Sequence, residues 1–152
     1  MSFGTSIVTL LKDDDTLFGV VEDRIYDYPE TGRKGLTRLL TPDAFDEKSG
    51  LLKPIILVLE TDDTADGEIV GLSTSFMTPV AVFIYDKGTT DMKYDNIIAA
   101  ETRIYSLLHL TQVTDAAQIL YQKTVKYKRQ PDLGDAAYFR AMYVVHAYRT
   151  VS

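Results

Sequence analysis

Five consecutive apolar residues lie in Pro54-Ile55-Ile56-Leu57-Val58-Leu59-Glu60-Thr61, and they set the architecture predicted for this 152-residue chain. Contiguous rather than alternating apolar residues are typical of a strand that is buried on both faces. The stretch Phe76–Tyr85 has the same near-continuous apolarity and predicts a second strand of this kind. We therefore expect the centre of the fold to be a sheet whose strands are buried on both faces.

The residues before this centre predict two helices and a strand. Apolar positions spaced by three and four indicate the helices, which the acidic triplet Asp13–Asp15 interrupts. We expect a first helix to about Lys12 and a short second helix from about Thr16, capped by Asp15. The stretch Arg24–Tyr28 then predicts a strand.

The longest predicted helix runs from roughly Met92 to Leu110. Its apolar residues share one face at about 100° per residue, whereas Arg103 falls on the opposite, polar face. Glu101 lies in the middle of the apolar face, and we expect its carboxylate to reach an edge of that face or to meet an Arg or Lys of the sheet. The apolar face comprises Tyr94, Ile97, Ile98, Ile104, Tyr105 and Leu108.

The C-terminal part predicts two long strands joined by a turn at Gln130–Asp135. The first strand, around Ile119–Lys128, alternates apolar and polar residues, although Leu120 and Lys123 break the alternation. The second, Tyr138–Val151, is mixed on both sides, as expected for an inner strand. The element order indicates an α+β fold with a mixed, mostly antiparallel sheet of about five strands and with helices packed on one face.

The length fits one domain, and we expect residues 1–152 to form it, with a long loop or arm at about 30–53. The segment Glu30–Lys53 is polar and has no sustained periodicity. Two interpretations stay open: an arm that is ordered on a neighbouring subunit, or a flap folded on its own subunit. The segment carries the basic residues Arg33, Lys34 and Arg38 and the apolar residues Leu36, Leu39 and Leu40.

Composition argues against several classes of function. The formal net charge of -6 argues against duplex nucleic acid as the main partner, because phosphate binding relies on an excess of Lys and Arg. Zero Cys excludes disulfide scaffolds, thiolate metal sites and Cys nucleophiles. The longest apolar runs, Ile55–Leu59 and Pro79–Tyr85, are far shorter than the ~18 residues of a bilayer span, and no basic leader is visible. We expect a soluble protein with no membrane partner.

No motif for phosphate, nucleophile or calcium chemistry is complete. Gly32–Gly35 lacks the spacing of a P-loop or a dinucleotide-binding turn. Gly71–Ser75 begins like a nucleophile elbow, but Ser75 stands where the second Gly belongs. Asp62–Gly67 is similar to the first half of an EF-hand loop, yet its twelfth position is Ser73 rather than a bidentate Glu. We expect no calcium site there.

The two histidines fall on different predicted elements, with His109 at the end of the long helix and His146 within a strand. Neither an HExxH spacing nor a Cys accompanies them, so they do not indicate a metal site. Nothing marks any Ser as activated. We therefore predict no catalytic residues, no cofactor-binding residues and no metal ligands, and we interpret the chain as a protein that is not an enzyme and needs no cofactor.

Charge is concentrated in two clusters of opposite sign. One interpretation is a merely solvated surface. The other is head-to-tail self-association, in which the basic cluster of one subunit meets the acidic cluster of the next. The basic cluster comprises Lys123, Lys126, Lys128 and Arg129. The acidic cluster comprises Glu60, Asp62, Asp63, Asp66 and Glu68.

Several short motifs follow one another in a family-like order: Leu10–Val21 with Arg24-Ile25-Tyr26, then Pro54–Leu59, then Val80–Tyr85 running into the long helix, and a closing hairpin. Over most of the chain this order resembles that of bacteriophage tail-terminator (tail-completion) proteins, and the length agrees. The segment Glu30–Lys53 is longer than is typical of that family. The matching residues of the long helix are Ala99, Ala100, Ile104, Leu107 and Leu108.

The resemblance implies a structural virion protein without catalytic residues. Such proteins form hexameric rings that cap the finished tail tube and then dock on the connector of the head, and sheath-capping proteins of contractile tails look similar. The expected partners are other copies of the chain, a tail-tube or sheath protein, and a head-connector or neck protein. We expect the protein in the tail or neck of the virion, and in the host cytoplasm during assembly.

A negatively charged ring would repel DNA phosphates, so the genome would pass through its lumen without specific binding. We expect the part of the acidic cluster near Asp62–Glu68 to line or approach that lumen. Other functions stay open. The chain could be another head–tail joining protein, such as a neck or head-closure subunit, or a small soluble ligand-binding domain or enzyme whose pocket is built from scattered residues.

Overall fold

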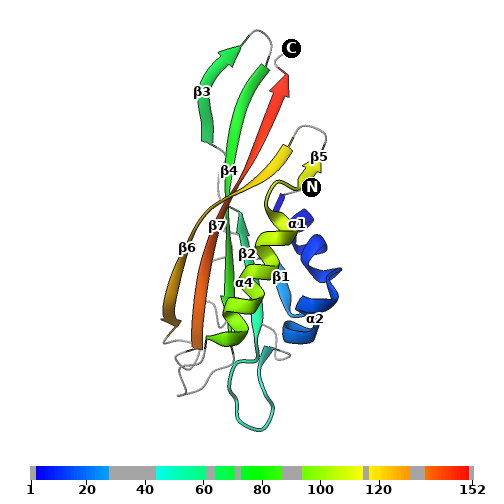
Figure 1. Cartoon of the computed structure of the whole chain (residues 1–152), viewed down its shortest axis with the longest axis vertical. Helices are drawn as coiled ribbons and strands as arrows, with labels where there is room; N and C mark the ends of the chain where they lie inside the picture. Colours follow the sequence, from blue (N-terminus) through cyan, green and yellow to red (C-terminus); the bar gives the residue numbers. More distant parts are fainter. Residues whose placement is uncertain are drawn as a thin grey trace.

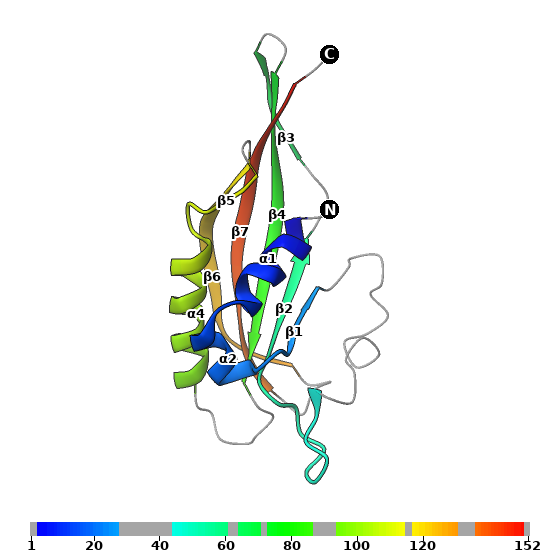
Figure 2. The same ribbon diagram turned by 90° about the vertical axis from the view of Figure 1, so that its right-hand side faces the viewer.

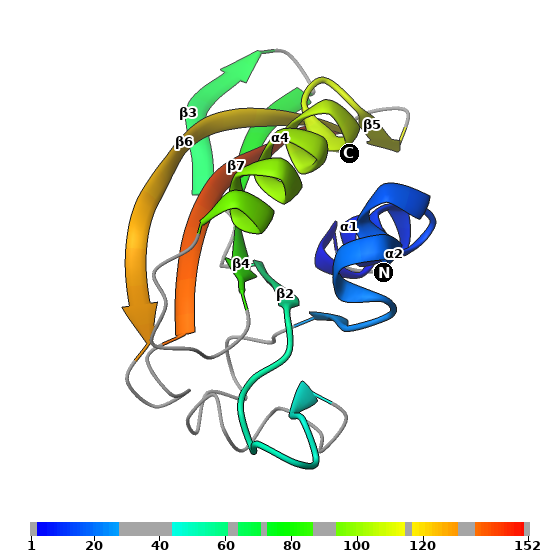
Figure 3. The same cartoon turned by 60° about the horizontal axis from the view of Figure 1, so that its bottom comes forward.

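In the described part of the chain, three helices cover one face of a strongly curved sheet in the computed structural model (Figure 1). The structure describes residues 3–27, 44–60, 64–70, 73–86, 94–114, 117–130 and 136–150. Figure 3 shows the sheet curling around α4, with the two N-terminal helices beside it. The predicted α+β class, with helices packed on one face of the sheet, is confirmed. The helices are α1 Phe3–Lys12, α2 Asp15–Val21 and α4 Asp95–Leu108.

The described part of the sheet contains seven strands in the order β1-β2-β4-β7-β6-β5, and β3 pairs with the half of β4 that β2 leaves open. β1 and β2 are parallel, and the other described pairs are antiparallel. The predicted C-terminal hairpin is confirmed as β6 and β7. The strands are β1 Ile25–Asp27, β2 Ile55–Glu60, β3 Thr64–Val70, β4 Ser73–Tyr85, β5 Gln112–Thr114, β6 Ala117–Gln130 and β7 Ala136–Thr150.

Two of these strands are not predicted by the sequence, which indicates about five. β3 lies in the acidic stretch between Asp62 and Ser75, and β5 is a short strand of 3 residues after α4. Neither has the apolar pattern of a strand. Their backbones are held by pairing with β4 and β6, and such pairing depends on the neighbouring strand more than on local propensity.

The second helix begins one residue earlier than predicted. Asp14, not Asp15, is its N-cap, and the Asp14 carboxylate accepts a hydrogen bond from the backbone N–H of Leu17 at 3.0 Å. In a run of three aspartates each one is a competent cap. Asp14 takes the position because its side chain is also held by Arg103 of α4, a contact that the local sequence does not reveal.

The central strands are buried on both faces, as their contiguous apolar residues predict. On β2, Ile56 and Val58 belong to the cluster beneath the helices, whereas Ile55, Leu57 and Leu59 belong to a second cluster on the opposite face. β4 divides in the same way. Its Val80, Val82 and Ile84 face the helices, and its Ala81 and Tyr85 lie in the second cluster.

The second cluster is closed in part by the end of the long segment Glu30–Lys53. Ala44 and Leu52 are buried in it, and an isolated bridge pairs Phe45 with Leu52. Residues 44–53 therefore fold on their own subunit, as a flap would. Residues 28–43 lie outside the described part of the chain, so an arm formed by them stays a prediction.

Two of the short sequence motifs, Arg24-Ile25-Tyr26 and Pro54–Leu59, contact each other directly. The Arg24 side chain is buried, and its Nε donates to the carbonyl of Pro54 at 2.9 Å. The backbone N–H of Ile56 donates to the carbonyl of Arg24 at 3.0 Å, and Ile25 lies in register with Ile56. The arginine of the first motif thus fixes the start of β1 against the start of β2.

The apolar face of α4 is narrower than the sequence predicts. Ile97, Ile104 and Leu108 are buried with Ala100, whereas Ile98 and Tyr105 are 43% and 41% exposed. Among the described residues, Glu101 meets neither an Arg nor a Lys. Its carboxylate accepts a hydrogen bond from the hydroxyl of Thr124 on β6 at 2.8 Å, because that hydroxyl lies on the sheet surface beneath the helix.

A ribbon made of β3 and the adjoining ends of β4 and β7 projects beyond the helices (Figures 1 and 2). We call it the projecting ribbon. β4 and β7 pair from Ser73↔Thr150 to Tyr85↔Tyr138, so the same two strands form both the ribbon and the centre of the sheet. None of the helices in the described ranges is long and apolar enough to cross a membrane.

Candidate functional site

The outer edge of β6 is open along its second half. β5 and the turn after α4 cover this edge as far as Tyr121, whose backbone N–H donates to Nδ1 of His109 at 3.1 Å. From Gln122 to Gln130, no strand in the described ranges pairs with the edge that faces away from β7. An open edge presents unpaired N–H and C=O groups and can recruit a second chain.

Two β-bulges interrupt β6 where its edge is open. The register with β7 shifts between Tyr121 and Lys123 and again between Val125 and Lys128. Inside the second bulge, Tyr127 has a φ of 59°, a left-handed conformation that costs a residue with a side chain about 1 kcal/mol or more. The first bulge explains why Lys123 breaks the alternation of the sequence. Bulges of this kind hinder backbone pairing with another strand.

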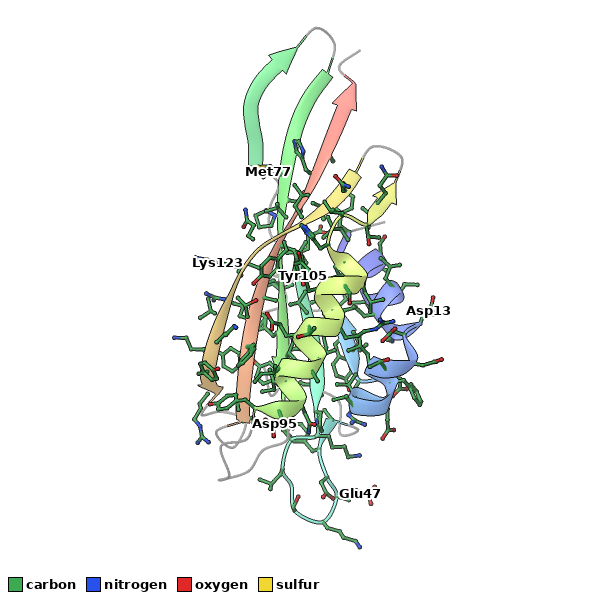
Figure 4. The ribbon with its side chains drawn as sticks, viewed as in Figure 1. Asp13, Glu47, Met77, Asp95, Tyr105 and Lys123 are labelled. Carbon is green, nitrogen blue, oxygen red and sulfur yellow. The ribbon has the colours of Figure 1, made fainter. Side chains whose placement is uncertain are left out.

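Exposed lysines and one exposed aromatic ring lie along this open edge. Tyr127 is 62% exposed, yet its ring packs edge-on against Tyr94 and Phe139, with centroid distances of 5.0 and 5.3 Å. Figure 4 shows Lys123 extending outward from β6, away from α4. An exposed aromatic ring that is held in place by its neighbours is typical of the residues that carry binding energy at an interface. We call the exposed residues Lys123, Lys126 and Lys128 the lysine edge.

Arg129 does not share this exposure, although the sequence groups it with the three lysines. Its Nε and Nη2 atoms are buried and have no hydrogen-bond partner among the described residues. Sequence proximity alone places it in the basic cluster, whereas two of its three guanidinium nitrogens are buried. The solvent-facing part of the basic cluster is therefore the lysine edge.

The acidic cluster is also smaller than the sequence predicts, because Glu60 is engaged in the fold. The Glu60 carboxylate accepts a hydrogen bond from the backbone N–H of Gly4 at 2.8 Å, at the start of α1. Thr5, in the same turn, donates its hydroxyl to the Asp27 carboxylate at 3.0 Å. Carboxylates at a helix N-terminus satisfy free N–H groups and complement the helix dipole.

Two other members of the acidic cluster, Asp66 and Glu68, lie on β3 in the projecting ribbon. They fall in an irregular segment, since the register with β4 shifts between Ala65 and Ile69. Asp62 and Asp63 lie outside the described residues. No described strand pairs with the side of β3 that faces away from β4, and β3, like the second half of β6, combines a bulge with charged residues of one sign.

The two charged strands occupy opposite edges of one sheet. β3 pairs with β4 on the side away from β7, and β6 pairs with β7 on the side away from β4. They are also displaced along the sheet. The lysine edge lies beside residues 138–142 of β7, whereas β3 lies next to the end of β4 that pairs with residues 146–150 of β7.

The most strongly perturbed carboxylate belongs to the helical layer. Asp14 is buried and accepts hydrogen bonds from Nε of Arg103 at 3.0 and 3.1 Å and from the neighbouring Nη2. The Arg103 hydrogen bonds lower the pKa of Asp14 below its usual value of 3.8, and burial opposes them only in part. The pair joins α2 to α4. Arg103 lies on the side of α4 opposite its apolar face, as the spacing predicts, and Asp14 is a partner that the spacing does not indicate.

A chain of polar groups joins α4 to β6, and an aromatic contact continues from it to β7. The Tyr121 hydroxyl lies 2.7 Å from that of Thr124, which in turn donates to Glu101. The Tyr121 ring packs edge-on against Tyr143, whose hydroxyl is buried with no hydrogen-bond partner in the described part of the structure. Burial raises the pKa of Tyr143 far above its usual range. A phenol held neutral in this way serves packing rather than acid–base chemistry.

The residues singled out for chemistry do not converge. His109 caps α4 and stacks on Tyr105, whereas His146 lies on β7. The stretch similar to an EF-hand loop continues as a strand from Thr64, so it does not form the loop that a calcium ion needs. Across the described ranges, no three His, Cys, Asp or Glu side chains gather as a metal site would require.

Two structural roles of side chains have no signal in the sequence. The ion pair of Asp14 with Arg103 and the capping of α1 by Glu60 join residues that are 89 and 56 positions apart. No spacing rule relates such distant positions. The left-handed residue Tyr127 has no local signal either, because Val125, Lys126, Tyr127 and Lys128 alternate regularly between apolar and polar residues.

The geometry defines an α+β protein whose distinctive surfaces are two oppositely charged strand edges. No protein-family model matches its sequence, and no curated protein matches it. Among solved structures, a chain of the "Virion of native gene transfer agent (GTA) particle" is similar to it, with a TM-score of 0.67 and 8% sequence identity. The similarity covers 97% of this chain and 96% of that chain. At this identity it shows that the two chains share a fold.

Proposed function

We propose that this chain is a structural virion protein that caps the phage tail tube as a ring, ends tail assembly and joins the tail to the head connector. The observation that carries the proposal is the fold shared, over 97% of the chain, with a chain of a virion particle. The order of the sequence motifs, which resembles that of tail-terminator proteins, supports the same role. Such a protein acts through shape and repeated contacts rather than by transforming a molecule.

The charge distribution suits this role in two ways. A terminator must match the end of the tube on one side and present a different surface on the other, which a small domain with dissimilar edges provides. A net charge of -6 per subunit would also keep DNA phosphates from adhering to a lumen. Within this proposal, Asp66 and Glu68 of the projecting ribbon lie near the lumen.

The proposed partners are other copies of the chain, a tail-tube or sheath protein, and a head-connector or neck protein. The genome passes through the ring without specific binding. The protein works in the virion tail or neck, after assembly in the host cytoplasm.

Electron microscopy of the purified protein tests the proposal. We expect rings, and we expect tail tubes assembled in the presence of the protein to carry one ring at one end and to stop growing there. Rings that bind a head connector but leave tube growth unchanged would identify a neck or head-closure subunit instead. A monomer that neither forms rings nor binds tubes, but turns over a small molecule, would refute the structural role.

A further inference from the structure

We propose that the lysine edge of β6 is the docking site for the β3 strand of a second copy of this chain. The inference rests on the proposed ring, because it assigns the contact through which neighbouring subunits meet. Its elements are two strand edges, one with Lys123, Lys126 and Lys128, and the other with Asp66 and Glu68. In this contact the lysine edge of one copy lies against the acidic strand β3 of the next.

The position of the two edges dictates the kind of assembly. Because they lie at opposite edges of one sheet, a subunit that uses its lysine edge still offers its own β3 to another copy. The contact is heterologous, a surface meeting a different surface. Repetition of such a contact closes into a ring when the rotation per subunit is suitable, whereas a two-fold dimer needs a self-complementary patch.

The bulges indicate that charge, not a continuous β-ladder, recognises the partner. The open part of β6 is interrupted twice, and β3 is irregular between Ala65 and Ile69. Neither edge offers the regular row of N–H and C=O groups that strand addition requires. Opposite charges instead select the partner edge and repel the like edge of another copy.

Tyr127 supplies the apolar part of the contact. Its ring is 62% exposed between Lys126 and Lys128, and its packing against Tyr94 and Phe139 holds it in one place. A preordered aromatic ring gives contact area at low entropic cost. The left-handed backbone of Tyr127 costs free energy, and the contact that the ring makes with the partner offsets this cost.

A charge swap between two variants tests the assignment. Variant A carries Lys126→Glu and Lys128→Glu, and variant B carries Asp66→Lys and Glu68→Lys. Each variant alone opposes like charges across the contact, so we expect A and B to run as monomers in size-exclusion chromatography with light scattering. An equimolar mixture restores both attractive pairings when A and B alternate, so we expect it to form particles of the wild-type ring size.

A matched control reverses two exposed lysines outside the proposed contact, Lys12 on α1 and Lys48 in the flap. The control variant, with Lys12→Glu and Lys48→Glu, has the same net charge as variant A and should form rings as the wild type does. Circular dichroism checks that each variant is folded.

The outcomes separate this inference from the proposed function. Rings from A alone or B alone, or no recovery in the mixture of folded A and B, would overturn the docking assignment and leave the ring itself standing. A wild type that stays monomeric at high concentration and low salt would overturn the ring and the docking assignment together.

Single cysteines give a second measurement that does not depend on charge reversal. The chain has no native Cys, so Lys126→Cys and Glu68→Cys each introduce one thiol. With a short bifunctional thiol reagent, we expect covalent dimers when the two variants are mixed and none from either variant alone. Equal cross-linking within each single variant would contradict a head-to-tail contact.

Discussion

Leu110 follows the last turn of α4 in a left-handed conformation, with a φ of 66°. Its side chain is 57% exposed, and its backbone N–H donates to the carbonyl of Ile119 at 2.8 Å. A glycine would keep this hydrogen bond and remove the steric cost of the left-handed backbone. We expect Leu110→Gly to raise the free energy of unfolding by about 0.5–1 kcal/mol, measured by urea denaturation.

Leu110→Ala is the matched control, because alanine removes the side chain but keeps the left-handed strain. It should give no stabilisation. Equal stability of the two variants would show that the φ of Leu110 is not a source of strain.

Asp14 gives a pH dependence whose sign follows from its ion pair. Hydrogen bonds from Arg103 hold the pKa of Asp14 below its usual 3.8 in the folded chain, so the carboxylate stabilises the fold above about pH 4 and loses that contribution as the pH falls through the folded pKa. Asp14→Asn keeps a capping oxygen and removes the charge. We expect it to cost about 1 kcal/mol at neutral pH.

The difference between wild type and Asp14→Asn should shrink as the pH is lowered below about 4, as measured by urea denaturation at each pH. Asp13→Asn provides the control, since Asp13 is exposed and adjacent in sequence. It should have little effect at any pH. A constant difference between wild type and Asp14→Asn across the acid range would contradict a lowered pKa.

At the scale of elements, the start of α1 is held on the sheet by Glu60 at the end of β2. Its carboxylate accepts from the backbone N–H of Gly4, one of the helix N–H groups that lack a partner within the helix. We expect Glu60→Ala to lower the free energy of unfolding by about 1 kcal/mol, and Glu60→Gln, which keeps an acceptor, to lower it less. Hydrogen exchange of the α1 amides should increase most in Glu60→Ala.

The hydrogen-bonded contact of α4 with β6 runs through one hydroxyl. Thr124 links Glu101 to Tyr121, and valine has the same shape without the donor. We expect Thr124→Val to lower the free energy of unfolding by about 1–2 kcal/mol, because the Glu101 carboxylate loses its partner. Thr124→Ser keeps the hydroxyl and should stay closer to wild type, and identical losses in both variants would point to packing instead.

The elements with regular apolar patterns are the ones that the sequence predicts. Contiguous apolar residues indicate β2 and β4, and spacings of three and four indicate the helices. β3 and β5 lack such a pattern because their order comes from strand pairing. Glu101 is predicted on the correct face of α4, but its partner could not be, since Thr124 reaches it only in the folded chain.

At the scale of the whole molecule, the proposed ring couples stability to concentration. Subunits that bind one another when folded are stabilised by mass action. We expect the thermal midpoint of the wild type to rise with protein concentration, and to fall when NaCl is raised from about 0.05 M to about 0.5 M, because salt screens the contact between charged edges. Variant A, measured by the same thermal scans, should show neither dependence.

A thermal midpoint that responds to concentration but not to salt would indicate a ring held by apolar contacts. The contacting residues would then be exposed apolar side chains of the helical layer, such as Phe18, Ile98 and Tyr105.

The sequence alone determined the helices, the two-faced burial of the central strands and the C-terminal hairpin, since each of these follows from hydrophobic periodicity within a short window. Only the tertiary structure decided which strands became edges, that Glu60 and Arg103 serve the fold, and that Lys123, Lys126 and Lys128 are exposed along an edge with which no described strand pairs. The physical reason is that strand pairing and ion pairs join distant residues through backbone groups and charges that many residue types can supply. The order of the strands therefore leaves little trace in local sequence.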